Sequence, residues 1–169
     1  MTRMGNDGRA AHGVRTDVVA IVTGGSSEIG RDVASGLTGW GWAIVIVYLE
    51  HQPVAEATVA KILAAEGKVV AVRADLADEL DVERLFAESS LAFAGVDVIA
   101  HTTTDRASIL YQHAARHLRS PGAIVSVLAA ERITPGIASE LRERGISVGR
   151  APPEEVLSFL DMWRQQTTG

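Results

Sequence analysis

An apolar, β-branched run that ends in a glycine-rich turn constrains the fold of this chain more than any other feature. The run covers residues 18–23 and is typical of a strand buried on both faces of a parallel sheet. Residues 24–30 then indicate a turn that opens a helix, in which Gly24 allows the tight bend and Gly30 lets the helix approach the strand. Because the first N–H groups of a helix have no partner within it, this turn predicts a site that cradles phosphate groups.

The rest of the chain alternates buried strands with helices. Further strands are expected at residues 43–49, 68–75, 96–100, 123–128 and 146–149, and helices at residues 53–66, between 78 and 95, and at 105–119, 137–144 and 154–165. This alternation predicts an α/β fold. The fold should have three layers, with a doubly wound parallel sheet between two layers of helices. The crossovers should be right-handed and the strands in the order 3-2-1-4-5-6.

Length and composition predict one domain. The chain has 169 residues, of which 47% are hydrophobic, and this suffices for one well-buried core over residues 17–169. Residues 1–16 lack apolar periodicity and are expected to form a mobile tail. No signal peptide is visible and no apolar run approaches the roughly 20 residues that span a bilayer, so no membrane association is expected. The sequence contains no cysteine, which fits a cytoplasmic protein.

The charge pattern argues against a nucleic-acid partner. The net charge is -5, and the sixteen basic residues are scattered along the chain. The one close pair, Arg142 and Arg144, is interpreted as the solvated face of a helix.

The turn at residues 23–30 resembles that of the short-chain dehydrogenase/reductase family, except that Glu28 stands where the family has its middle glycine. The resemblance continues through Asp75-Leu76, a pair whose carboxylate in the family accepts a hydrogen bond from the adenine amino group, and through residues 95–100. The resemblance covers nearly the whole chain from Val18 onward. Within the family, the chain resembles 3-oxoacyl-ACP reductase-like members. It implies a Rossmann fold that binds a dinucleotide, NAD or NADP.

The residues that the resemblance assigns to the dinucleotide follow the first four predicted strands. They are Gly24, Ser26, Ser27, Glu28, Ile29, Gly30, Leu49, Asp75, Leu76, Thr102 and Thr103. The choice between NAD and NADP stays open. Glu50 stands one position late for the acid that binds ribose hydroxyls in NAD enzymes, and His51 is the only basic candidate for an NADP phosphate. His101 replaces the start of the family's Asn-Asn-Ala-Gly turn and is interpreted as a hydrogen-bonded structural histidine rather than a cofactor contact.

The family's catalytic serine, tyrosine and lysine have no counterparts at the matching positions. Ala129 stands at the serine position, and residues 130–144 contain neither tyrosine nor lysine. We therefore expect an NAD(P)-binding protein without ordinary carbonyl reductase activity, acting as a regulatory or scaffolding paralogue. One alternative is a reductase that recruits Tyr111, His101 or residues of a partner subunit, and another is a truncated gene product without function.

Two further patterns concern metal binding and assembly. His113 and His117 stand four residues apart on one helix, but no third ligand accompanies them, so no metal site is expected. The last predicted strand, at residues 146–149, leaves a sheet edge, and the helix after it has a broad apolar face. These features predict a two-fold homodimer.

Overall fold

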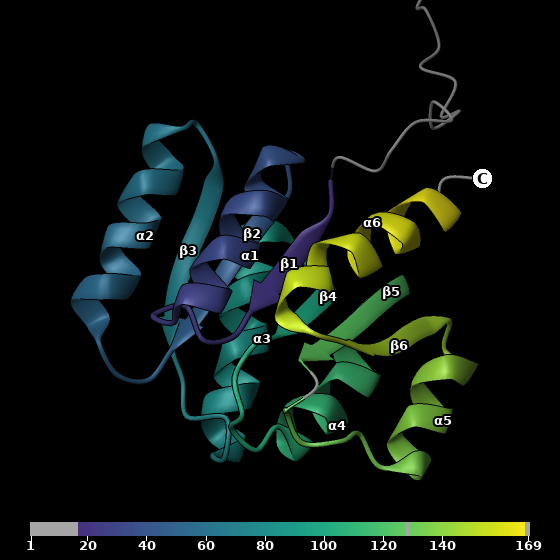
Figure 1. The fold of residues 1–169 in the computed structure, drawn as a ribbon. Coiled ribbons are helices and arrows are strands. Elements are labelled where there is room, and N and C mark those ends of the chain that lie inside the picture. Colours follow the sequence, from purple (N-terminus) through teal and green to yellow (C-terminus); the bar gives the residue numbers. More distant parts are fainter. Residues whose placement is uncertain (1–16, 128, 168–169) are drawn as a thin grey trace, which may run out of the picture.

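The computed structural model describes residues 17–127 and 129–167, and at its centre lies one parallel sheet (Figure 1). Its strand order is β3-β2-β1-β4-β5-β6, which confirms the predicted topology. The strands are β1 (Val19–Val22), β2 (Ala43–Tyr48), β3 (Lys68–Arg73), β4 (Val96–His101), β5 (Leu118–Val127) and β6 (Ile146–Ala151). The helices are α1 (Glu28–Gly39), α2 (Gln52–Ala64), α3 (Glu79–Phe93), α4 (Ser108–His117), α5 (Pro135–Glu143) and α6 (Val156–Gln166), with a short 3-10 turn η1 (Pro153–Glu155) before α6.

The sheet separates two apolar cores, so the architecture has three layers. On one face, residues of α1, α2 and α6 pack against alternate strand residues such as Ala20 and Val22. On the other face, α3, α4 and α5 cover Val19 and Ile21. Both side-chain sets of β1 are therefore buried, which explains why the strand is a continuous apolar run rather than an alternating one.

Most strand boundaries differ from the prediction by one or two residues, and the start of β5 lies further from it. The differences in β5 and β6 have a local cause. β5 begins at Leu118, where we predicted the end of a helix, because Pro121 cannot continue a helix and Leu118 pairs with Val96 of β4. β6 extends to Ala151 because Arg150 and Ala151 pair with the end of β5. The expected tail at residues 1–16 and the end of the strand expected at 123–128, residue 128, lie outside the described residues.

The apolar face of α6 is buried within the chain. Val156, Leu160 and Trp163 belong to the core between this helix and the sheet. Leu157 lies so close to Gly36 of α1 that a Cβ there would sit 2.5 Å from the leucine Cδ1, and Phe159 covers Gly149 of β6 in the same way. Among the described residues, none of the helices combines the length and apolar character needed to cross a bilayer.

A buried carboxylate ties three strands together at their amino-terminal end. Asp97 of β4 has no exposed surface, and its Oδ2 accepts a hydrogen bond from the backbone N–H of Val19 at 2.9 Å. Arg119 of β5 donates to both carboxylate oxygens, from Nε at 3.1 Å and from Nη2 at 2.6 Å. A charge removed from water in this way is tolerated because both of its oxygens are hydrogen-bonded.

We predict that Asp97→Asn lowers the free energy of unfolding by about 2–3 kcal/mol, because it weakens the charge-assisted bonds to both Val19 and Arg119. Urea denaturation measures the change. The control is Asp161→Asn, which breaks the short-range pair of Asp161 with Arg164 at 2.6 Å and should cost under about 1 kcal/mol. Equal losses in the two variants would contradict the role given to Asp97.

Candidate functional site

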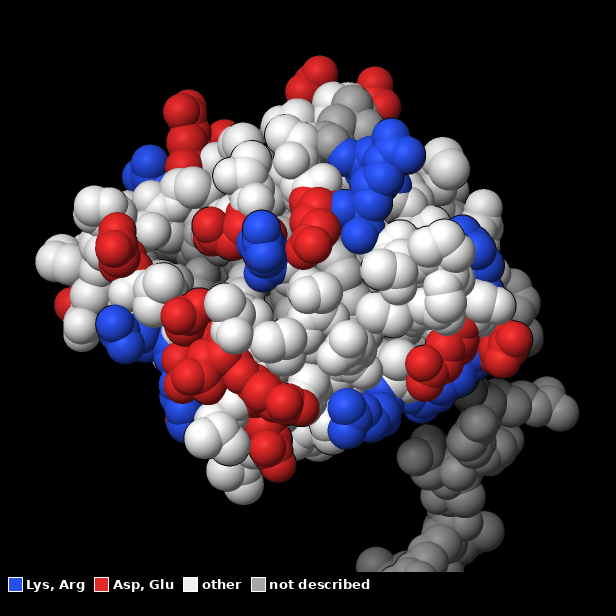
Figure 2. All heavy atoms as spheres, turned by 90° about the horizontal axis from the view of Figure 1, so that it is seen from below, with Lys and Arg blue, Asp and Glu red and all other residues white. Residues whose placement is uncertain are grey.

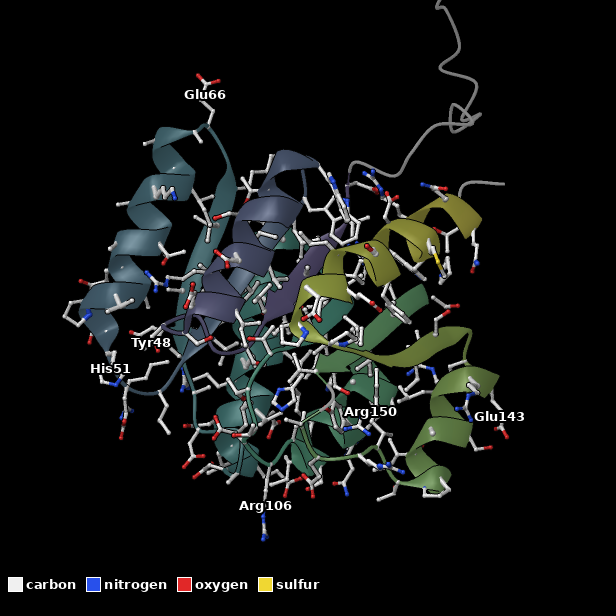
Figure 3. The ribbon with its side chains drawn as sticks, in the orientation of Figure 1. Tyr48, His51, Glu66, Arg106, Glu143 and Arg150 are labelled. Carbon is white, nitrogen blue, oxygen red and sulfur yellow. The ribbon has the colours of Figure 1, made fainter. Side chains whose placement is uncertain are left out.

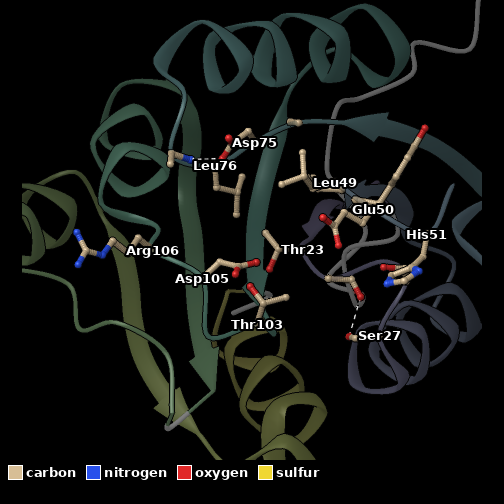
Figure 4. Close-up of a pocket in the computed structure, with 16 residues that line it drawn as sticks. Thr23, Ser27, Leu49, Glu50, His51, Asp75, Leu76, Thr103, Asp105 and Arg106 are labelled. Atoms are coloured by element: carbon tan, nitrogen blue, oxygen red, sulfur yellow. Dashed lines mark hydrogen bonds between the residues drawn. The ribbon is translucent and has the colours of Figure 1, made fainter.

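A cavity of about 480 Å³ opens at the carboxyl ends of β1, β2 and β3 (Figure 4). Ligands of open parallel sheets bind at this edge, where the strand order reverses on either side of β1. Figure 2 shows the molecule from this side, where acidic and basic side chains both reach the surface. The lining residues come from the ends of four strands and the connections that follow them. They are Thr23, Gly24, Ser26, Ser27, Val47, Tyr48, Leu49, Glu50, His51, Ala74, Asp75, Leu76, Ala77, Thr103, Asp105 and Arg106.

The glycines of the β1–α1 turn leave no room for side chains. Gly24 has a φ of +68°, which L-residues rarely adopt, and a Cβ there would lie 2.5 Å from Cγ2 of Thr103. At Gly30 a Cβ would lie 2.1 Å from the carbonyl oxygen of Gly24. The first turn of α1 therefore packs directly on the backbone that leaves β1.

Ser27 caps α1, so its hydroxyl already has two partners in the turn. Its Oγ accepts from the N–H of Gly30 at 3.1 Å and donates to the carbonyl of Gly24 at 2.7 Å. Glu28 is the first residue of the helix and its side chain is exposed. That orientation keeps the carboxylate outside the cavity wall, while its charge stabilises the helix N-terminus.

The residues that we assigned to the dinucleotide divide into two sets. Those that line the cavity are Gly24, Ser26, Ser27, Leu49, Asp75, Leu76 and Thr103, whereas Glu28, Ile29, Gly30 and Thr102 do not line it. Ile29 packs against the core, and Gly30 shapes the turn from behind. Thr102 is buried and holds β1 to β4, because its hydroxyl donates to the carbonyl of Thr23 at 2.7 Å and its N–H donates to Thr23 Oγ1 at 3.0 Å.

Asp75 forms part of a turn and also faces the cavity. Its Oδ1 accepts from the N–H of Ala77 at 2.9 Å, and its own N–H donates to Oδ2 of Asp81 at 2.9 Å. The hydrogen bond from the Asp75 N–H, aided by Arg84, lowers the pKa of Asp81. Asp81 therefore remains a carboxylate that fixes the position of Asp75 in the cavity wall.

Thr103 brings an unsatisfied hydroxyl to the cavity. Its Oγ1 is buried and has no hydrogen-bond partner in the described part of the chain. Thr23, Thr103 and Asp105 all direct their side chains toward the middle of the cavity in Figure 4, whereas Arg106 points away from it. Our assignment missed Asp105, which could have been found as the carboxylate in the short polar connection after β4.

Comparison with known proteins identifies the family of the chain. The profile of the short chain dehydrogenase family matches residues 18–120. The chain belongs to this family.

Two curated relatives each match about half of the chain. A 3-oxoacyl-[acyl-carrier-protein] reductase of Synechocystis is 35% identical over 86 residues, which are 51% of this chain and 35% of the relative. An uncharacterized oxidoreductase of Bacillus subtilis is 42% identical over 83 residues, or 48% of this chain and 27% of that protein. The chain thus spans between about a quarter and a third of the length of these two curated relatives.

A solved family member has the same fold. The crystal structure of a short chain dehydrogenase from Burkholderia cenocepacia in complex with NADP is 27% identical and superposes with a TM-score of 0.68. The match covers 80% of this chain and 73% of that one.

His101 and Tyr111, the two side chains considered as catalytic substitutes, are both buried. His101 uses both ring nitrogens, with Nδ1 2.9 Å from Thr23 Oγ1 and Nε2 3.0 Å from the carbonyl oxygen of Asp105. Tyr111 lies edge-on to the His101 ring, with the ring centroids 5.9 Å apart. Burial lowers the pKa of His101 and raises the pKa of Tyr111 to about 12, so both groups are neutral near pH 7.

The pair His113 and His117 stacks with Phe86 rather than converging on a shared ligand position. Over residues 17–127 and 129–167, no group of three or more His, Cys, Asp or Glu side chains is placed to hold a metal ion.

We predict that stability falls as the pH drops below about 6.5, the ordinary pKa of histidine. The folded-state pKa of His101 lies below that value, so the unfolded chain takes up a proton before the folded chain does. The loss continues until the pH reaches the folded-state pKa. Urea denaturation between pH 8 and 5 should show a shallower decline for His101→Gln than for the wild type. Burial also lowers the pKa of His117, and His117→Gln measures that separate share. An unchanged decline in His101→Gln would contradict the assignment.

Proposed function

We propose that this chain binds an adenine dinucleotide, NAD or NADP, in the cavity beside the β1–α1 turn and does not carry out ordinary carbonyl reduction. The observation that carries the binding proposal is the meeting of Gly24, Asp75 and Thr103 in one cavity, although these residues are far apart in the sequence. The related Burkholderia structure holds NADP, which supports the same class of ligand.

The residues around the turn fit the dinucleotide. The pyrophosphate would lie against Gly24 and the start of α1, where any side chain at Gly24 would collide with Thr103. The adenine would lie toward Asp75 and Leu76, between a carboxylate that accepts hydrogen bonds and an apolar side chain. The unsatisfied Thr103 hydroxyl would gain a partner. When bound, the dinucleotide supplies a nicotinamide ring able to carry hydride.

Two residues at the mouth of the cavity bear on the choice between the two dinucleotides. Glu50 and His51 both line it, after the end of β2, and both are exposed. The Glu50 carboxylate suits free ribose hydroxyls, whereas the His51 imidazole, which can donate a hydrogen bond, suits a ribose phosphate. Binding measurements with both dinucleotides decide between these opposing preferences.

The proposal of no ordinary carbonyl reduction rests on the absence of a usable proton donor. Residues 130–144, where the family pattern has its tyrosine and lysine, contain neither, and Ala129 has no hydroxyl to hold a substrate oxygen. Tyr111 is 1% exposed and His101 is fully buried, so neither meets a substrate at the cavity surface. We therefore favour a regulatory or scaffolding role that depends on binding over a reductase with substitute residues.

We predict weak but measurable binding of NAD, NADH, NADP or NADPH in calorimetric titration. A ligand at a hundredfold over its dissociation constant would raise the free energy of unfolding by about 2.7 kcal/mol. Gly24→Val should abolish binding because the side chain fills the cradle. Gly39→Ala is the matched control, since a Cβ at Gly39 meets nothing within 4 Å. Asp75→Ala, which leaves the turn glycines intact, should weaken binding without removing it. Equal binding by wild type and Gly24→Val would mean that the turn is only structural.

We predict no turnover of alcohols, ketones or 3-oxoacyl substrates with either dinucleotide. The assay follows the reduced nicotinamide by its absorbance at 340 nm. Restoring only the serine, in Ala129→Ser, should not create activity because no tyrosine or lysine accompanies it. Activity that saturates in both cofactor and carbonyl substrate, and that disappears in Gly24→Val, would instead support the reductase alternative.

We further propose that two copies of the chain form a homodimer through the edge strand β6, which pairs only with β5 among the described strands. Light scattering at micromolar concentration should give twice the chain mass of 17.9 kDa. A mass of one chain would contradict the proposal.

A further inference from the structure

A second cavity, of about 400 Å³, lies between the ends of β5 and β6 and helix α5. It shares no lining residue with the first cavity. Three of its lining residues are arginines and the others are small, apolar or hydroxylic. The lining residues are Ser126, Arg132, Ile133, Ala138, Arg142, Val148, Gly149 and Arg150.

The three arginines reach this cavity from three separate parts of the chain. Arg132 belongs to the connection after β5, Arg142 to the last turn of α5, and Arg150 to β6. Figure 3 shows Arg150 extending from β6 toward the interior of the molecule, whereas Glu143 points outward from α5. Their convergence therefore results from the tertiary fold and not from one basic stretch of sequence.

No carboxylate lines this cavity to balance the positive charge. Arg84, Arg119 and Arg164 elsewhere in the chain each pair with an aspartate. Arg132 and Arg142, by contrast, form no ion pair within residues 17–127 and 129–167. The carboxylate that adjoins Arg132 in sequence is Glu131, and its Oε2 accepts from the N–H of Ala107, at the start of α4, at 3.0 Å.

A buried hydroxyl lines the same cavity. Ser126, near the end of β5, is 1% exposed, and its Oγ makes no hydrogen bond of ordinary geometry in the described part of the chain. The Tyr111 hydroxyl lies near enough for Ser126 to lower the pKa of Tyr111, against the larger effect of burial, and this hydroxyl is itself without a partner of ordinary geometry. Leaving such a group unpaired destabilises the folded chain, so unsatisfied buried hydroxyls are rare unless a ligand or ion supplies the missing partner. Arg150 is the register partner of Ser126 on β6, and both residues line the cavity. One guanidinium nitrogen of Arg150, Nη2, donates to the carbonyl of Ala130 at 3.2 Å.

We propose that this cavity binds the phosphate group of a small organic phosphomonoester. Guanidinium groups match phosphate oxygens through paired hydrogen bonds, and three of them from different directions suit a tetrahedral dianion better than a planar carboxylate. The Ser126 hydroxyl donates to one further oxygen. The cavity is larger than a phosphate group, and Ile133, Ala138 and Val148 provide an apolar wall for the organic part of the ligand.

The experiment titrates the full chain with phenyl phosphate, inorganic phosphate and benzoate at low ionic strength, followed by backbone amide NMR. Phenyl phosphate should shift the amides of Ser126 and Gly149 saturably and bind at least about tenfold more tightly than benzoate. Arg142→Gln should weaken it about tenfold or more, because a charge-assisted hydrogen bond is lost. Ser126→Ala should weaken it severalfold without changing the packing of the apolar wall.

Arg144→Gln is the matched control, because Arg144 follows α5, is exposed and does not line the cavity. It should change the affinity by less than about twofold. Equal effects of Arg142→Gln and Arg144→Gln, absence of saturable shifts, or tighter binding of benzoate would each overturn the proposal. Displacement of phenyl phosphate by NAD would also overturn it, since the arginines would then hold part of the dinucleotide. Failure of NAD to bind at all leaves this test intact, because the two cavities have no residue in common.

Discussion

The close approach of helix α1 to the end of strand β1 is the constraint on which the geometry of the first cavity, at the carboxyl ends of the strands, depends. The Cα of Gly30 stands where a side chain would collide with the carbonyl of Gly24, and Ser27 closes the same turn with two hydrogen bonds. This contact brings the start of α1 to the position where the first cavity opens. The threonines that directly follow β1 and β4 then fix the floor of the cavity, since Thr23 is hydrogen-bonded to Thr102 and its Oγ1 lies 2.9 Å from Nδ1 of His101.

Neighbouring polar side chains after β4 have two different roles: some bond to other parts of the chain, and one stays available at the cavity. The polar atoms of His101 and Thr102 are already used in contacts with Thr23, which link the end of β4 to the end of β1. Thr103, the next residue, retains an unsatisfied hydroxyl at the cavity. A change of one or two positions along the chain thus separates groups that hold the sheet together from groups that remain available to a ligand.

The sequence predicted the sheet well because its evidence is local. Continuous apolar runs mark strands buried on both faces, and the glycine turn identifies β1 and therefore the edge at which the cavity opens. Asp75 and Leu49 were found through the same strand ends. The start of β5 was missed because its pairing with Val96 is nonlocal. Arg142 is exposed, as the interpretation of a solvated helix face expects, but it also lines a cavity with Arg132 and Arg150. Because these three residues are far apart in the secondary structure, no local periodicity predicts that they share a cavity.

The seating of α6 has a consequence for the order in which the chain folds. Leu157 fills the space over Gly36 of α1, and Trp163 lies edge-on to Trp42 beside β2 with ring centroids 5.8 Å apart. The core on that face of the sheet therefore closes only when the last helix meets elements formed near the beginning of the chain. Contacts of such long sequence separation slow folding. During synthesis, the α1 face stays uncovered until residues 156–166 have left the ribosome, which makes it the surface a nascent chain must protect from aggregation.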